Sequence, residues 1–119
     1  MFIILSSIQV LATEHGYEKW ANFPHEREKL INLIQRKKNI LILSGDRHRG
    51  AIYKHNKIIE ITASSLNKPG SSDNETDKLI QGRIHKEINY GILVIKEGVL
   101  DIQLKNNDGT ILESATMSL

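Results

Sequence analysis

Two short runs of consecutive hydrophobic residues stand out along the chain, at residues 2–5 and 40–43. Unbroken apolar runs of this length are typical of β-strands that are buried on both faces. The segment between them carries an apolar stripe with the spacing of one helical face. Its members are Arg27, Leu30, Ile31 and Ile34, with Leu33 beside them. The pattern therefore predicts a βαβ unit over residues 2–50, with its two strands parallel.

The flanking residues indicate where the helix begins and ends. Pro24 is favoured in a first helical turn, so Asn22 or Phe23 should precede the helix. The basic run at residues 36–38 suits the negative end of the helix dipole, and Asn39 should end the helix.

The rest of the chain predicts mixed or antiparallel strands at residues 51–62 and 91–118. The first group should turn at His55-Asn56, and the second at Asp108-Gly109. Alternation near the C-terminus should direct one set of side chains inward, namely Leu100, Ile102 and Leu104. Between the two groups, residues 63–78 are rich in polar residues, Gly and Pro, which predicts a long loop that is either functional or disordered.

Composition narrows the class of protein. A length of 119 residues suits one domain. The absence of cysteine excludes a disulfide scaffold, a zinc–cysteine site and a thiol nucleophile. A net charge of +2 gives no support to a nucleic-acid or membrane partner, and no run is long enough for a membrane helix. We interpret the apolar start as a strand and not as a signal peptide, because it lacks a basic leader. The localisation stays open between cytoplasm and periplasm.

The candidate chemistry lies in Gly45-Asp46-Arg47-His48, directly after the second apolar strand. Ligands bind at the carboxyl ends of strands in open α/β sheets. In extended backbone, Asp46 and His48 would point to the same face, and a carboxylate with an imidazole forms half of a metal site. Arg47 and Arg49 are able to hold a phosphate. The alternative is a solvated turn with no ligand.

This segment resembles the last metal-site motif of the PhoD-like alkaline phosphatases, within the calcineurin-like metallophosphoesterases. The similarity begins with the apolar strand and Gly-Asp-x-His at residues 40–48. Further stretches that resemble the family in the same order are residues 6–10, 18–27, 59–67 and 89–92. The match covers nearly all of residues 3–104.

The resemblance implies an α/β fold in which a mixed β-sheet and one long helix form the C-terminal half of a metallophosphoesterase β-sandwich. Residues 1–119 would be a single partial domain. His48 would be a metal ligand, and Asp46 a ligand or an orienting residue. Gln9, Arg47 and Asn67 would contact the substrate or the ligands. The cofactor would be a two-metal centre of divalent ions such as Fe, Mn, Zn or Ca, and the substrate a phosphoester.

The family's earlier metal-binding motifs are missing from this chain. We therefore expect a C-terminal fragment that is incomplete and inactive alone, whether a remnant, a truncated product or one piece of a split protein. Its exposed sheet surface should be covered by a homo-oligomer, in particular a twofold dimer, or by a missing N-terminal portion. The remaining histidines have no metal spacing and should be surface or loop residues. They are His15, His25, His55 and His85.

Two alternatives come from other classes of protein. The first is a non-catalytic oligomeric interaction module that keeps the fold and has lost the chemistry. The second is a nucleic-acid binder that uses the basic residues at 36–38 and 47–49. Because no aromatic residues are interleaved with them, the sequence favours no nucleic-acid partner.

Overall fold

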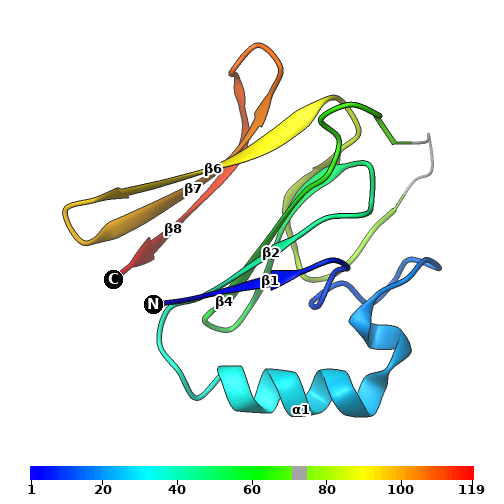
Figure 1. Ribbon diagram of the computed structural model, residues 1–119, viewed down its shortest axis with the longest axis vertical. Coiled ribbons are helices and arrows are strands. Elements are labelled where there is room, and N and C mark those ends of the chain that lie inside the picture. The colour runs from blue at the N-terminus through cyan, green and yellow to red at the C-terminus, as the bar shows by residue number, and fades with distance from the viewer. Residues whose placement is uncertain (71–74) are drawn as a thin grey trace.

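The computed structural model describes residues 1–70 and 75–119 and arranges them in three layers (Figure 1). One helix covers the outer face of a five-stranded sheet, and a three-stranded sheet packs on the other face. The helix is α1 (Pro24–Ile34), preceded by a short 3-10 turn at Trp20–Asn22. No helix within the described residues is long and apolar enough to cross a membrane.

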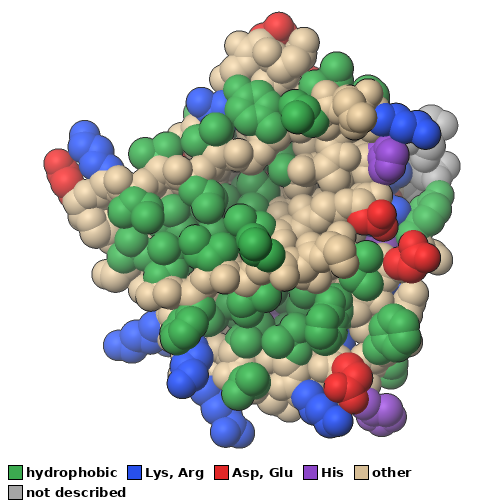
Figure 2. Space-filling model, in the orientation of Figure 1, with side chains coloured by type: hydrophobic (Ala, Val, Ile, Leu, Met, Phe, Trp, Pro, Cys, Tyr) green, Lys and Arg blue, Asp and Glu red, His purple; other side chains and the backbone are tan. Residues whose placement is uncertain are grey.

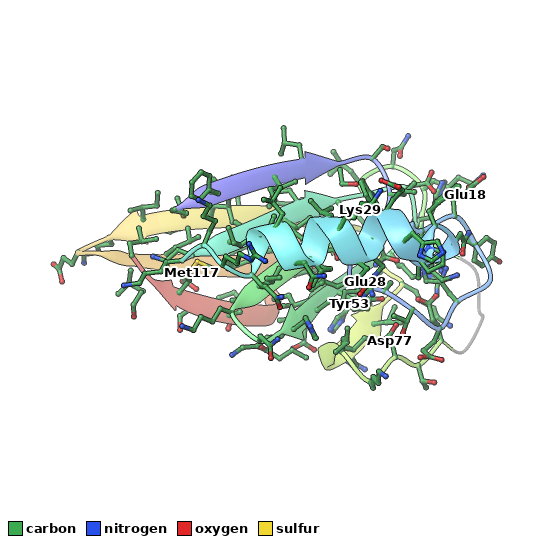
Figure 3. All side chains as sticks on the ribbon, turned by 90° about the horizontal axis from the view of Figure 1, so that it is seen from below. Glu18, Glu28, Lys29, Tyr53, Asp77 and Met117 are labelled. Atoms are coloured by element: carbon green, nitrogen blue, oxygen red, sulfur yellow. The ribbon has the colours of Figure 1, made fainter. Side chains whose placement is uncertain are left out.

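The five-stranded sheet has the strand order β1-β2-β4-β3-β5. Its strands are β1 (Phe2–Ser6), β2 (Ile40–Ser44), β3 (Gly50–His55), β4 (Ile58–Ala63) and β5 (Ile80–His85). β1, β2 and β4 are parallel, so their carboxyl ends meet at one edge of the sheet, whereas β3 is antiparallel to both of its neighbours. Figure 3 looks onto α1 and shows β1 and β5 at opposite edges.

The second sheet is an antiparallel meander. It consists of β6 (Asn89–Lys96), β7 (Val99–Asn106) and β8 (Ile111–Ser118). The inward face of β7 is fully buried at Leu100, Ile102 and Leu104, as the alternation predicts. These side chains pack against apolar residues of β2, β3 and β4. The expected fold class, a mixed sheet with one helix in a β-sandwich, is confirmed.

The predicted C-terminus of the helix is wrong. α1 begins at Pro24 as expected, but it ends at Ile34 and not at Asn39, and its last turn contains no basic residue. Ile34 is the last residue of the helix that the core buries, and residues 35–38 are all exposed. A helix gains most of its stability from its packed face, so it does not continue where that face ends. Asn39, with φ of 58°, turns the chain into β2.

The first strand is present but is not buried on both faces, which corrects the expectation for residues 2–5. β1 is an edge strand, and Phe2 and Leu5 are 55% and 77% exposed. The run at residues 40–43 does lie inside the sheet, with only Leu43 partly exposed. An apolar run shows that the side chains are hydrophobic. It does not show whether another strand or layer covers them.

The strand β5 was not expected from the sequence. It pairs with β3 at the opposite edge of the sheet, and its register shifts opposite Gly50 and Ile52. Gly82 interrupts it with φ of +78°, so it lacks the regular alternation that marks a strand. The predicted loop at residues 63–78 contains residues 71–74, which lie outside the described residues.

A buried clamp fixes the segment that follows β1. Val10 and Leu11 are fully buried although they lie outside any strand. Their amides donate to the carboxylate of Glu60, at 3.0 Å and 2.6 Å. Their carbonyls accept from Arg27, at 2.7 Å and 2.9 Å. The backbone polar groups of both residues are therefore satisfied from two sides inside the core, as burial requires.

We expect Arg27→Met to lower the free energy of unfolding by about 3 kcal/mol, because it leaves two buried carbonyls unpaired and removes a positive charge that favours the buried Glu60 carboxylate. Urea unfolding measures the loss. The matched control is Arg36→Met, which removes an exposed arginine and should change stability by less than about 0.5 kcal/mol. Equal effects of the two substitutions would contradict the clamp.

Candidate functional site

The candidate site lies at the edge of the sheet where β1, β2 and β4 end. Three segments leave the sheet there: residues 7–9 after β1, residues 45–49 after β2, and Ser64 and Ser65 after β4. Converging carboxyl ends of parallel strands form the place at which α/β sheets bind ligands. The motif singled out from the sequence is therefore where a ligand site is expected.

The 45–49 loop directs alternate side chains outward and inward. Asp46 and His48 are exposed, whereas Arg47 and Arg49 are buried. The backbone is not extended as the sequence argument assumed, because Asp46 and His48 have φ of 70° and 52°. Asp and His tolerate this left-handed conformation better than most residues. Both nevertheless line one pocket of about 350 Å³, together with Tyr17, Lys68 and Gly70 among others.

A buried ion cluster supports the loop from within. Glu75 Oε2 accepts from Arg47 Nη2 at 2.5 Å and from Arg49 Nη1 at 2.8 Å. All three side chains are at most 7% exposed. The Arg47 guanidinium also lies 4.4 Å from the centroid of the Tyr17 ring, a cation–π contact. The two arginines that the sequence offered as phosphate ligands are thus already engaged with a carboxylate.

The residues after β4 hold the backbone of the loop. Ser65 Oγ donates to the His48 carbonyl at 3.0 Å, and Ser64 Oγ donates to the Arg49 carbonyl at 3.0 Å. Gly70 packs so closely that a Cβ there would lie 2.4 Å from the His48 carbonyl oxygen. These contacts fix the backbone at His48 and therefore the point from which its side chain extends. They also give Ser64 and Ser65 a structural role.

A chain of hydrogen bonds joins the three strand ends beneath the loop. Ser44 Oγ lies 2.8 Å from Thr62 Oγ1, which also accepts from Gln9 Nε2 at 2.8 Å. Gln9 Oε1 lies 2.9 Å from His15 Nε2, and His15 Nδ1 accepts from the Tyr17 amide. This network assigns the proton of His15 to Nε2. Gln9 is buried, so it supports the site from below and does not face the pocket.

His15 is held neutral by its surroundings. Burial, followed by the positive charge of Arg47, lowers the pKa of His15 from 6.5 to about 4. Lys19 and Arg49 act in the same direction, and Glu75 opposes them. Lys19 is itself buried and donates to the His15 carbonyl and to Asn22. The sequence did not predict the role of His15, because a single histidine six residues after Gln9 forms no recognisable motif.

The other predicted residues lie elsewhere. Asn67 is exposed and does not line the pocket of Asp46 and His48. His25 is exposed on α1, and His55 is partly exposed at the end of β3. His85, expected at the surface or in a loop, is buried in β5, where its Nε2 lies 3.0 Å from Glu113 of the second sheet. That expectation was wrong because β5 was missed.

The donors present do not fit a complete metal centre. A two-metal centre needs about six protein ligands, since each ion requires several donors. The pocket lining contains one imidazole, that of His48, and two carboxylates, those of Asp46 and Glu18. Within residues 1–70 and 75–119, no group of three or more His, Cys, Asp or Glu side chains is placed to hold a metal ion. These described residues therefore do not form a complete metal centre by themselves.

No known family model matches the chain, and no curated protein matches it. Solved structures do share its fold. GAP50, the anchor in the inner membrane complex of Plasmodium, matches with a TM-score of 0.76 at 10% identity, over 98% of this chain and 36% of its own. PhoD matches with a TM-score of 0.67 at 16% identity, over 98% of this chain and 28% of its own.

A purple acid phosphatase from yellow lupin (Lupinus luteus) seeds matches with a TM-score of 0.70 at 13% identity, over 98% of this chain and 24% of its own. Identities this low show a shared fold. The chain thus has a phosphoesterase-like fold, and it spans about a quarter to a third of the length of these three structures.

The neutral state of His15 predicts how stability depends on pH. Between pH 6.5 and about 4, the unfolded chain binds a proton at His15 that the folded chain does not, so acidification destabilises the fold. His15→Gln keeps a neutral amide donor toward Gln9 and removes this titration. We expect wild type to lose stability relative to His15→Gln as the pH falls from 6.5 to 4, measured by urea unfolding.

The exposed His25 provides the control for this experiment, because His25→Gln should run parallel to wild type over the same pH range. Parallel curves for wild type and His15→Gln would show that His15 is not buried in a positive environment.

Proposed function

We propose that this chain is part of a metal-dependent phosphoesterase domain similar to the PhoD-like phosphatases, and that its 45–49 loop forms one arm of the active site. The observation that carries the proposal is the placement of Asp46 and His48. Both side chains are exposed in one pocket at the carboxyl ends of the parallel strands, on a loop that buried arginines and two serines hold in place.

In this proposal His48 is a metal ligand, and Asp46 is a ligand or orients one. A carboxylate and an imidazole are suitable donors for zinc, iron or manganese. The remaining ligands would come from polypeptide outside this chain, in keeping with the small share of the related structures that it spans. The buried residues Gln9 and Arg47 would position the loop. The isolated chain would bind divalent metal weakly and would not hydrolyse phosphoesters.

A second candidate is a non-catalytic interaction module built on the same fold. One of the structures that share the fold is described as an anchor, which makes a scaffolding role a reasonable alternative for this chain. The two candidates differ in what Asp46 and His48 do. If the chain is part of a phosphoesterase, Asp46 and His48 coordinate or orient a metal ion. If it is an interaction module, they are solvated surface residues.

We expect the purified chain to release no p-nitrophenol from p-nitrophenyl phosphate, or from its diester, above the metal-only rate in Mn²⁺, Zn²⁺ or Ca²⁺. The reason is the donor count, because the described residues place no group of three or more ligands together, and a two-metal centre needs about six. Release is followed by absorbance.

The variants for the same assay are His48→Ala and, as a control, His25→Ala on the exposed face of α1. Turnover that His48→Ala abolishes and His25→Ala preserves would contradict the expectation of inactivity. It would show that the chain completes a catalytic site by itself.

A further inference from the structure

The outer edge of β1 is an unprotected β-edge. Within the described residues β1 pairs only with β2, and the Phe2 amide donates to the Asn39 carbonyl at 2.9 Å. Because backbone direction alternates along a parallel strand, the amides and carbonyls of Ile3 and Leu5 point to the open side. Edge strands are usually protected by charge, proline or a bulge, and residues 2–9 contain no charged residue and no proline.

The side chains on both faces of this edge are apolar and exposed. Ile3 and Leu5, 45% and 77% exposed, lie on the side of the three-stranded sheet. Their β2 partners show this, because Leu41 belongs to that core and Leu43 packs against it. Phe2, 55% exposed, lies on the α1 side. Figure 2 shows hydrophobic side chains gathered on this face in two patches, one toward the three-stranded sheet and one toward α1. The open end of the sandwich therefore exposes apolar surface from both of its layers.

A groove of about 510 Å³ adjoins the carboxyl end of β1. It is lined by Leu5, Ser6, Ser7, Ile8, Trp20, Phe23 and Glu26. Trp20 Nε1 donates to Ser6 Oγ at 3.1 Å, which places the indole beside the end of the strand. Phe23 is 61% exposed at the groove. Glu26 is the one charged residue among the groove's described lining, so the groove suits an apolar side chain.

We propose that a second copy of this chain pairs with the β1 edge about a twofold axis that passes beside Ile4. Two identical edge strands related by a twofold axis pair antiparallel. With Ile4 opposite its own copy, Ile3 lies opposite Leu5 of the other copy. This register uses the outward amide and carbonyl of both residues, which gives four hydrogen bonds between the copies.

The same register places Phe2 of one copy opposite Ser6 of the other, on the α1 face. Phe2 is then directed to the groove beside Trp20 and Phe23, and the twofold axis creates this contact twice. On the opposite face, Ile3 and Leu5 of the two copies cover each other. One chain thus carries both the exposed aromatic side chain and the groove that accepts it, which is the self-complementarity that an isologous interface requires.

The partner is a second copy because one chain carries both halves of the contact, the exposed Phe2 and the groove beside Trp20 that receives it. The edge strand carries no charge that an oppositely charged partner would neutralise. The inference rests on the fold and not on the proposed function, since antiparallel pairing puts the two 45–49 loops at opposite ends of the joined sheet.

The test measures self-association and the environment of Trp20, the only tryptophan in the chain. We expect sedimentation equilibrium of the full chain to show a monomer–dimer equilibrium. Trp20 emission should shift to the blue over the same concentration range, because Phe2 of the second copy covers the indole. Leu5→Lys should raise the dimer dissociation constant at least about 30-fold, as expected for loss of an interface hot spot.

Phe2→Ala should weaken the dimer and abolish the concentration dependence of Trp20 emission. It removes an exposed side chain, so its monomer should fold even if Leu5→Lys does not. The control is Leu33→Lys, at a leucine that is 63% exposed on α1, away from the edge, and it should leave the dimer intact. A monomer at all concentrations would overturn the proposal. A dimer that Leu5→Lys and Phe2→Ala leave unchanged would also overturn it.

Discussion

The clamp of Arg27 and Glu60 on the Val10–Leu11 backbone is the constraint on which the rest of the structure depends. It draws a non-strand segment into the core between α1 and the sheet, where unpaired peptide groups would be strongly unfavourable. Glu60 itself is fully enclosed, and burial raises its pKa above the ordinary value. Because the clamp fixes the two residues that follow Gln9, it also places Gln9 against Thr62. The polar layer beneath the candidate site is therefore built by the same contacts that build the core.

Buried charge around the 45–49 loop divides its residues into two roles. Arg47, Arg49 and Glu75 form an ion cluster inside the protein, and their positive excess contributes to keeping His15 neutral. Arg47 and Arg49 also line the pocket, but both are buried and paired with Glu75. Asp46 and His48 are the exposed ionisable side chains of the loop. The geometry thus separates the residues that support the loop from the two that are available to a ligand. The proposed phosphoesterase role follows from that separation and from the shared fold.

Much of the fold could be predicted, because several of its elements have strong local sequence patterns. The apolar runs gave β1 and β2, the 3.6-residue spacing gave α1, and period-two alternation gave β7. The features that failed depend on tertiary contacts. β1 is exposed because no strand of the described residues lies on its outer side, and β5 was not predicted because Gly82 breaks its alternation.

The candidate site was only partly predictable for the same reason. Gly45-Asp46-Arg47-His48 marked the correct loop, since a motif after an apolar strand is a local signal. Its left-handed residues depend on contacts with Ser64, Ser65 and Gly70, which lie at least 15 residues away in the sequence. The roles of Gln9 and His15 likewise arise from hydrogen bonds that join separate strand ends.

In the proposed function, the 45–49 loop forms one metal-binding arm of a phosphoesterase-like site. Paramagnetic broadening of backbone amide signals by Mn²⁺ tests it directly, because the effect reports weak binding and its location. We expect the amides of residues 45–49 to broaden first, followed by those of Lys68 and Gly70 across the same pocket. Broadening that is strongest at another carboxylate and histidine pair, such as His85 and Glu113, would contradict the claim, as would no localised broadening at all.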